Sequence, residues 1–166
     1  EYVKERTRRF RNRKGIFATT PSSGDHPAWS EAKSADFYEW WCPCPGRGEF
    51  QYLNFKNLIF SECREGKEWN FERVAAETYY RCSHCSARLT DADKATMIQA
   101  GRLQAVDPDT HQAREPQSGN RCKALRIPGT YSLFTLWGNL AVSFLKATIK
   151  GQDALRIFVT DELAEG

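Results

Sequence analysis

The sequence lacks any apolar run that approaches the roughly 18 residues of a membrane-spanning helix, so we expect no membrane partner. It also lacks a strong charge bias, because 24 basic and 21 acidic residues leave a net charge of only +3. Such a small excess does not by itself indicate a nucleic-acid partner. No export signal is visible among the charged first residues, and no methionine starts the chain. We therefore expect a segment cut from a longer protein.

Two catalytic motifs are missing as well. A nucleotide-hydrolysing site needs a glycine-rich phosphate loop with a lysine and a hydroxyl residue, and the short run Gly46-Arg47-Gly48 has neither. A metal-dependent nuclease needs clustered carboxylates on adjacent strands, whereas the acidic residues here fall mostly in expected loops and helices. The chain alone is therefore predicted to bind no nucleotide tightly and to cut no nucleic acid.

The residues that are present predict an α+β fold with a buried core, since 40% are hydrophobic and 13% are aromatic. Short apolar or aromatic runs predict strands, the first of them buried and ending in a hydroxyl-rich loop. The segment 62–71 is charged and is predicted to be an exposed excursion, and residues 107–121 are predicted to be a loop. The predicted strands cover residues 15–18, 37–41, 50–53 and 77–81.

Three helices are predicted in the second half of the chain. Thr90 and Asp93 have the spacing of a capping box, and Gly101 is a suitable stop for the helix between them. Apolar residues from 136 to 145 share one helical face, which Gly151 ends. A last short helix is predicted over residues 155–163.

Four of the six cysteines predict a metal site. Cys82 and Cys85 form the C-x-x-C unit of a zinc knuckle, and Cys42 and Cys44 form a C-x-C on the preceding expected hairpin. Together they would make a small zinc-ribbon-like region with a structural zinc ion, because no nearby general base suggests a catalytic one. The alternative is a metal-free site held by aromatic packing. The isolated Cys63 and Cys122 are interpreted as buried or incidental thiols.

A basic run lies near the start of the chain. Arg8, Arg9, Arg11 and Arg13 could contact DNA phosphates, or they could form a solvated edge of the fold.

The order of these motifs resembles the large subunit of lambda-like phage terminases over nearly the whole chain. The matching features are a strand followed by Thr-Thr-Pro, a run of aromatics before a Cys-Pro knuckle, a second knuckle after an aromatic, and a helix ending in glycine. In sequence order they are residues 18–21, 35–41, 44–48, Gln51, Leu53, Tyr80, Cys82, Cys85, Lys94, Met97, Gly101, Tyr131, Ser132 and 158–165. Arg47, Thr160 and Ala164 depart from the family pattern.

The resemblance implies a DNA-packaging motor whose whole chain is an enzyme, using ATP and Mg²⁺ to translocate DNA and cutting concatemers endonucleolytically. Its implied partners are double-stranded DNA, the terminase small subunit and the portal of the prohead, in the host cytoplasm. Thr19 and Thr20 match the family's ATP coupling motif. The alternatives are a stand-alone zinc-ribbon module that binds DNA or protein without catalysis, and a metal-free scaffold.

The resemblance also implies a division of the chain into three segments. Residues 1–35 would end the ATPase domain, residues 36–101 would form the zinc-ribbon-like region with its helix, and residues 102–166 would lead toward a nuclease domain.

Overall fold

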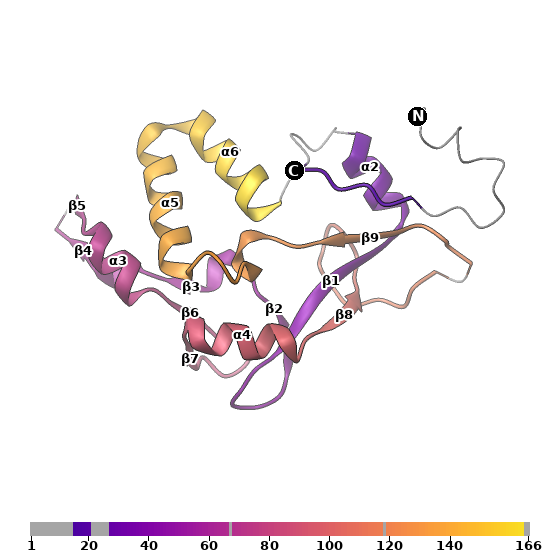
Figure 1. The fold of residues 1–166 in the computed structure, drawn as a ribbon, viewed down its shortest axis with the longest axis horizontal. Coiled ribbons are helices and arrows are strands. Elements are labelled where there is room, and N and C mark those ends of the chain that lie inside the picture. The colour runs from indigo at the N-terminus through magenta and orange to yellow at the C-terminus, as the bar shows by residue number, and fades with distance from the viewer. Residues whose placement is uncertain (1–14, 21–26, 67, 118, 165–166) are drawn as a thin grey trace.

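A computed structural model describes residues 15–20, 27–66, 68–117 and 119–164 (Figure 1). It confirms the α+β class: two small sheets and a separate two-stranded hairpin are combined with five α-helices within these residues. No helix in the described ranges has the length and apolar character needed to cross a bilayer. The arginines at positions 8, 9, 11 and 13 lie outside the described residues, so the DNA contact predicted there stays a prediction.

The larger sheet is built around one long strand, β1 (Asp36–Pro43). The strands β2 (Phe50–Tyr52) and β8 (Arg102–Ala105) pair with it antiparallel, and β9 (Lys123–Arg126) pairs with it parallel. The aromatic residues of β1 come in two adjacent pairs, Phe37-Tyr38 and Trp40-Trp41, so both faces of the pleated strand carry aromatic side chains. Strands from distant parts of the chain therefore meet on the aromatic run that precedes the first knuckle.

The smaller sheet carries the second knuckle. Its strand order is β3 (Leu58–Ile59), β6 (Tyr79–Arg81) and β7 (Arg88–Leu89), all antiparallel. A separate hairpin, β4 (Arg64–Glu65) with β5 (Glu68–Trp69), projects from this part of the molecule. The single-turn 3-10 helices are η1 (Phe55–Asn57), η2 (Ser61–Cys63) and η3 (Gly129–Tyr131).

The prediction of an exposed excursion over 62–71 agrees with the exposed Glu62, Arg64, Gly66 and Glu68, but it does not hold where the segment joins the core. Cys63 is buried, and its cluster includes Val74 and Leu145, with Trp69 packed against it. The buried Cys63 thiol and the partly buried Trp69 ring anchor the hairpin to the core, and the charged sequence of the segment does not reveal this packing.

The three helices predicted in the second half of the chain begin and end close to where the sequence placed them, whereas the helices at Pro27–Ser34 and Phe71–Glu77 were not predicted. The Asp93 carboxylate accepts a hydrogen bond from the Thr90 N–H at 2.7 Å, which confirms the capping box. Gly151 has a φ of 114°, in the region that favours glycine, and separates the last two helices. The helices are α2 (Pro27–Ser34), α3 (Phe71–Glu77), α4 (Asp91–Gln99), α5 (Trp137–Lys150) and α6 (Gln152–Leu163).

Helices α3 and α5 approach so closely that their contact needs a glycine. A Cβ placed on Gly138 would lie 2.1 Å from the backbone oxygen of Ala75, which no side chain can accommodate. The approach fixes α5 against α3, and α5 in turn packs along α6.

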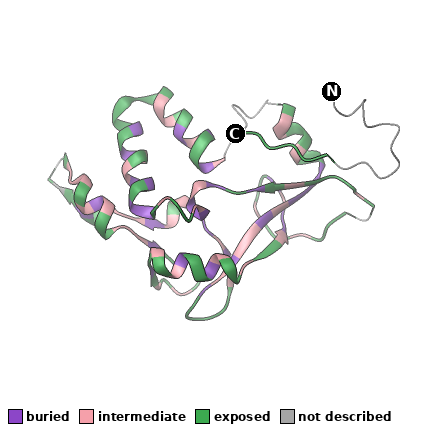
Figure 2. Cartoon of the chain, in the orientation of Figure 1, coloured by how far each residue is buried: buried purple, intermediate pink, exposed green. Residues whose placement is uncertain are grey.

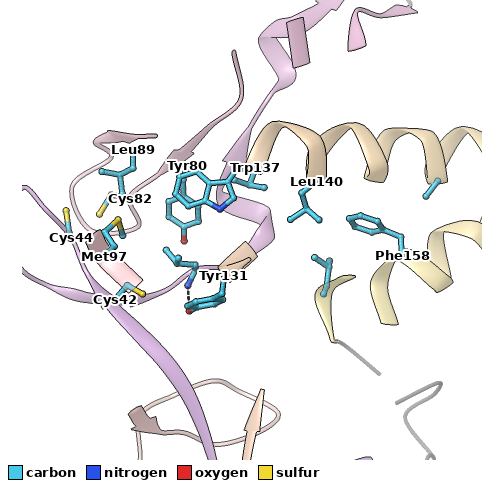
Figure 3. Close-up of a cluster of buried hydrophobic side chains, with 14 residues drawn as sticks. Cys42, Cys44, Tyr80, Cys82, Leu89, Met97, Tyr131, Trp137, Leu140 and Phe158 are labelled. Carbon is cyan, nitrogen blue, oxygen red and sulfur yellow. Dashed lines mark hydrogen bonds between the residues drawn. The ribbon is translucent and has the colours of Figure 1, made fainter. Parts of the chain in front are cut away.

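The hydrophobic core runs continuously from the cysteines to the C-terminal helices. Buried positions lie along β1 and alternate with exposed ones along α5 (Figure 2). One cluster joins Cys44 and Cys82 through Tyr80 and Trp137 to Phe158 on α6 (Figure 3). The knuckle region and the helices are therefore parts of one packed unit.

The prediction of a buried strand at 15–18 is wrong. These residues have no regular structure, and Ile16 and Phe17 are 96% and 64% exposed. A strand is stable only when a neighbour pairs with its backbone groups, and no described residue offers that pairing.

A buried ionic cluster holds the 107–113 turn against the larger sheet. The Glu39 carboxylate is fully buried, and its Oε1 lies 2.8 Å from both Arg126 Nη2 and His111 Nδ1. The Tyr52 ring stacks on the imidazole and lies under the guanidinium. A buried carboxylate needs such partners, because leaving its charge uncompensated costs several kcal/mol, or roughly 3–5 kcal/mol when a partner is removed.

Candidate metal centre

Three of the four cysteines predicted to bind metal converge on one point. The Sγ atoms of Cys44, Cys82 and Cys85 all lie within 4.8 Å of one another, and the Cys44 and Cys85 sulfurs are 3.5 Å apart. Tetrahedral zinc with Zn–S bonds of about 2.3 Å places its thiolates about 3.8 Å apart. The three sulfurs thus fit the spacing of a zinc site.

Two backbone turns of the same form deliver these sulfurs. In the first, Cys44 N–H donates to the Glu49 carbonyl at 2.8 Å, and Gly48 N–H donates to the Cys44 carbonyl at 2.7 Å. The second repeats the pattern at Cys82, whose N–H donates to the Ala87 carbonyl at 2.9 Å and whose carbonyl accepts from Ser86 N–H at 3.0 Å.

The repetition extends to the backbone angles. Gly48 and Ser86, at equivalent positions of the two turns, have φ values of 73° and 60°. Each turn closes a hairpin, β1–β2 in one case and β6–β7 in the other, as the sequence predicted. Two equivalent knuckles facing each other are the usual framework of a zinc ribbon.

Backbone N–H groups of the two knuckles act to lower the pKa of Cys82 and of Cys44. Burial acts to raise the pKa of Cys82, but the N–H groups of Cys85 and His84 and the neighbouring thiols lower it to about 7. At Cys44 burial dominates and raises the pKa, although the N–H groups of Arg47 and Gly46 act to lower it. N–H groups aimed at a sulfur stabilise its charged form, which is the form that ligates a metal.

Gln51 lies on β2 of the first hairpin, and its side chain forms hydrogen bonds with the second knuckle. Its side chain is 3% exposed, and Nε2 donates to Cys82 Sγ at 3.3 Å. Its Oε1 accepts from the backbone N–H of Ser83 at 3.0 Å and from the Ser83 hydroxyl at 2.9 Å. Partners of this kind orient metal ligands and tune their basicity.

Cys42 is not one of the three clustered thiols. It sits on β1 opposite Gln51, fully buried, on the side of the core where Figure 3 draws Tyr131. Burial raises the pKa of its thiol to about 12, so it is neutral. The structure therefore brings together three of the four predicted ligands and places the fourth among the aromatic side chains.

The first knuckle has Arg47 where the second knuckle has Cys85. Arg47 is exposed, and the His84 side chain at the tip of the other turn contacts the Phe50 carbonyl at 3.2 Å and the Glu49 carboxylate at 3.7 Å. The donor set of the described chain is thus three thiolates. Cys44, Cys82 and Cys85 are the residues that would hold a metal here.

The other predicted site residues lie apart from this centre. Thr19 and Thr20 are exposed, and the Thr19 hydroxyl contacts the Thr20 carbonyl at 3.5 Å. Cys63 is buried beneath the β4–β5 hairpin and Cys122 is exposed, so neither approaches the three thiols. Cysteine spacing alone does not identify Gln51 as a partner of the site, although its place seven residues after Cys44 is part of the family resemblance.

Comparison with protein families shows that residues 1–102 match the family described as "Phage terminase large subunit gpA, ATPase domain". The match covers both knuckles, and the chain belongs to this family. Membership gives it a role in a phage DNA-packaging motor, as part of an ATPase that works with DNA and the packaging machinery. No curated protein and no solved structure matches the chain.

Proposed function

We propose that this chain is the segment of a terminase large subunit that ends the ATPase domain and leads toward a nuclease domain. The whole subunit would translocate DNA into proheads with ATP and Mg²⁺ and cut concatemers, in contact with the small subunit and the portal, in the host cytoplasm. Residues 1–35, 36–101 and 102–166 would be its three successive parts. The observation that carries the proposal is the family match over residues 1–102.

Zinc is the metal that suits the three thiolates best. Soft sulfur ligands select Zn²⁺ over hard cations, and a ribbon of two knuckles uses the ion as a structural cross-link. Cys44, Cys82 and Cys85 would hold it, and Gln51 would orient Cys82. Since the three sulfurs are part of the main hydrophobic cluster, the ion would stabilise the face on which the C-terminal helices pack.

A stand-alone zinc-ribbon module is the second candidate, and the paired knuckles favour it. The coding sequence around this segment distinguishes the two candidates. The motor requires a coding sequence with a phosphate loop upstream of this segment and a cluster of nuclease carboxylates downstream.

The coupling role of Thr19 and Thr20 can be tested in the terminase that contains this segment. Replacing Thr20 with alanine is expected to lower DNA packaging by roughly tenfold, the effect of losing one hydrogen bond of about 1.4 kcal/mol, while ATP hydrolysis persists. The measurement is DNA packaged into purified proheads, alongside phosphate release.

Thr20→Ser is the matched control, because it keeps the hydroxyl and should retain packaging. The proposal would be wrong if Thr20→Ala packaged DNA as well as the unmodified protein, or if serine failed as completely as alanine.

A further inference from the structure

The smaller sheet has one face in the core and one face exposed to solvent. Leu58, Tyr80 and Leu89 lie on the buried face, paired across the three strands. The opposite face presents Arg81 and Arg88, which are exposed, next to the half-buried Tyr79. We call these three residues the Arg81–Arg88 face.

Two like charges face each other directly across this hairpin. Arg81 and Arg88 are register partners in the β6–β7 ladder. Opposite like charges destabilise an antiparallel pair, so the free protein keeps an unfavourable contact here. A bound anion between the two side chains would convert that repulsion into attraction.

Tyr79 holds the two guanidinium groups in place. The Arg88 guanidinium lies over the tyrosine ring, 4.3 Å from its centroid, and Arg88 Nη2 contacts the Glu77 carbonyl at 3.4 Å. Arg81 Nη2 lies 3.4 Å from the Tyr79 hydroxyl. The arginines are thus positioned on a short, stiff ribbon, and less entropy is lost when they bind a ligand.

The surroundings leave the positive charge of the face largely unneutralised. Residues 78–90 contain Arg81, His84 and Arg88 but no aspartate or glutamate. The Glu77 carboxylate on the preceding helix interacts electrostatically with Arg88, but both of its oxygens already accept hydrogen bonds from Arg73, at 2.9 and 3.0 Å.

We propose that the Arg81–Arg88 face binds the phosphate backbone of double-stranded DNA. The inference rests on the proposed function in a DNA-packaging motor. Planar guanidinium groups bind phosphate oxygens through two parallel hydrogen bonds, and a two-stranded ribbon is narrow enough to follow a DNA groove. The contact is to phosphates and is independent of sequence, which suits a protein that must move along any DNA.

The test is the affinity of the 1–166 chain for a mixed-sequence DNA duplex, measured by fluorescence anisotropy across a salt series. The double substitution Arg81→Gln with Arg88→Gln should weaken binding more than about tenfold at 0.1 M salt and reduce the salt slope by about 2, since each phosphate contact contributes about 0.9. Both side chains are exposed, so the fold should survive, as circular dichroism can verify.

Two matched variants separate this site from general attraction. Arg81→Lys with Arg88→Lys keeps the charge and should retain the salt slope, whereas Lys150→Gln with Arg156→Gln removes equal charge from the exposed C-terminal helices and should bind as the unmodified chain does.

The proposal is overturned if the unmodified chain does not bind the duplex, or if the glutamine pair at 81 and 88 binds it as tightly. It is also overturned if the pair at 150 and 156 weakens binding equally, or if the pair at 81 and 88 weakens binding of polyglutamate and not of DNA. Such a failure leaves the packaging experiment with Thr20 unaffected, so the two proposals can fail separately.

Discussion

Replacing Cys82 with serine is expected to abolish tight zinc binding and to unfold the two knuckles. Serine is a poor ligand for Zn²⁺ at neutral pH, and only two thiolates of the clustered three would remain. In small domains a structural zinc ion contributes roughly 10–16 kcal/mol of apparent binding free energy, which is also folding free energy. The loss should therefore be among the largest that any single substitution causes here.

Isothermal titration of the metal-free chain with zinc, followed by thermal unfolding with and without a chelator, measures both effects. Unmodified chain should unfold at a lower temperature when the chelator is present, whereas Cys82→Ser should unfold at the same low temperature in both conditions.

Two further variants make the result specific to the three clustered thiols. Cys42→Ala should keep its zinc and lose only about 1 kcal/mol of stability, the cost of a small cavity. Gln51→Ala should keep the site but bind zinc about 10 to 100 times more weakly, because it removes the hydrogen bond to Cys82. If the Cys42→Ala chain contained no zinc, the result would show instead that Cys42 is a ligand.

Replacing Trp137 with alanine is expected to lower the free energy of unfolding by about 3–5 kcal/mol. The indole is fully buried, its Nε1 donates to the Thr130 carbonyl at 2.9 Å, and its ring lies 5.2 Å from that of Tyr80. The Lys94 ammonium lies over the Trp137 ring, 5.1 Å from its centroid. Trp137 thus joins the second knuckle strand, α4 and α5 in one cluster.

Thermal denaturation should register this loss as a fall in Tm of roughly 10 °C, since each kcal/mol shifts a domain of this size by about 2–4 °C. Phe134→Ala is the matched control, because that ring is fully exposed and its removal should change stability by less than about 0.5 kcal/mol. Equal Tm values for Trp137→Ala and the unmodified chain would contradict the central place of this residue in the core.

Local signals in the sequence were sufficient for much of the fold. Some residues set the ends of helices and hairpins through contacts with close neighbours in the sequence. They are the capping box at Thr90, the glycine at 151 and the turn residues around each knuckle, so these helices and hairpins could be predicted. The two hairpins of the candidate site follow from the same local chemistry.

Features that depend on distant partners could not be read from the sequence. From the C-x-C spacing alone, Cys42 and Cys44 are equally good candidates for metal ligands. Only the packing of the folded chain places Cys42 in the core and Cys44 beside the other two thiols. The ion pair between Glu39 and Arg126 joins residues 87 positions apart, and the apolar run at 15–18 is exposed because no described strand pairs with it. Tertiary contacts override local preference in each case.

Metal content of the purified chain tests the three-thiolate centre most directly. Elemental analysis should find close to one zinc per chain, and replacing it with Co²⁺ should produce intense near-ultraviolet thiolate charge-transfer bands that disappear in Cys44→Ser, Cys82→Ser and Cys85→Ser alike. Less than about half an equivalent of zinc, together with freely reactive thiols at all three positions, would contradict a metal centre at the paired knuckles.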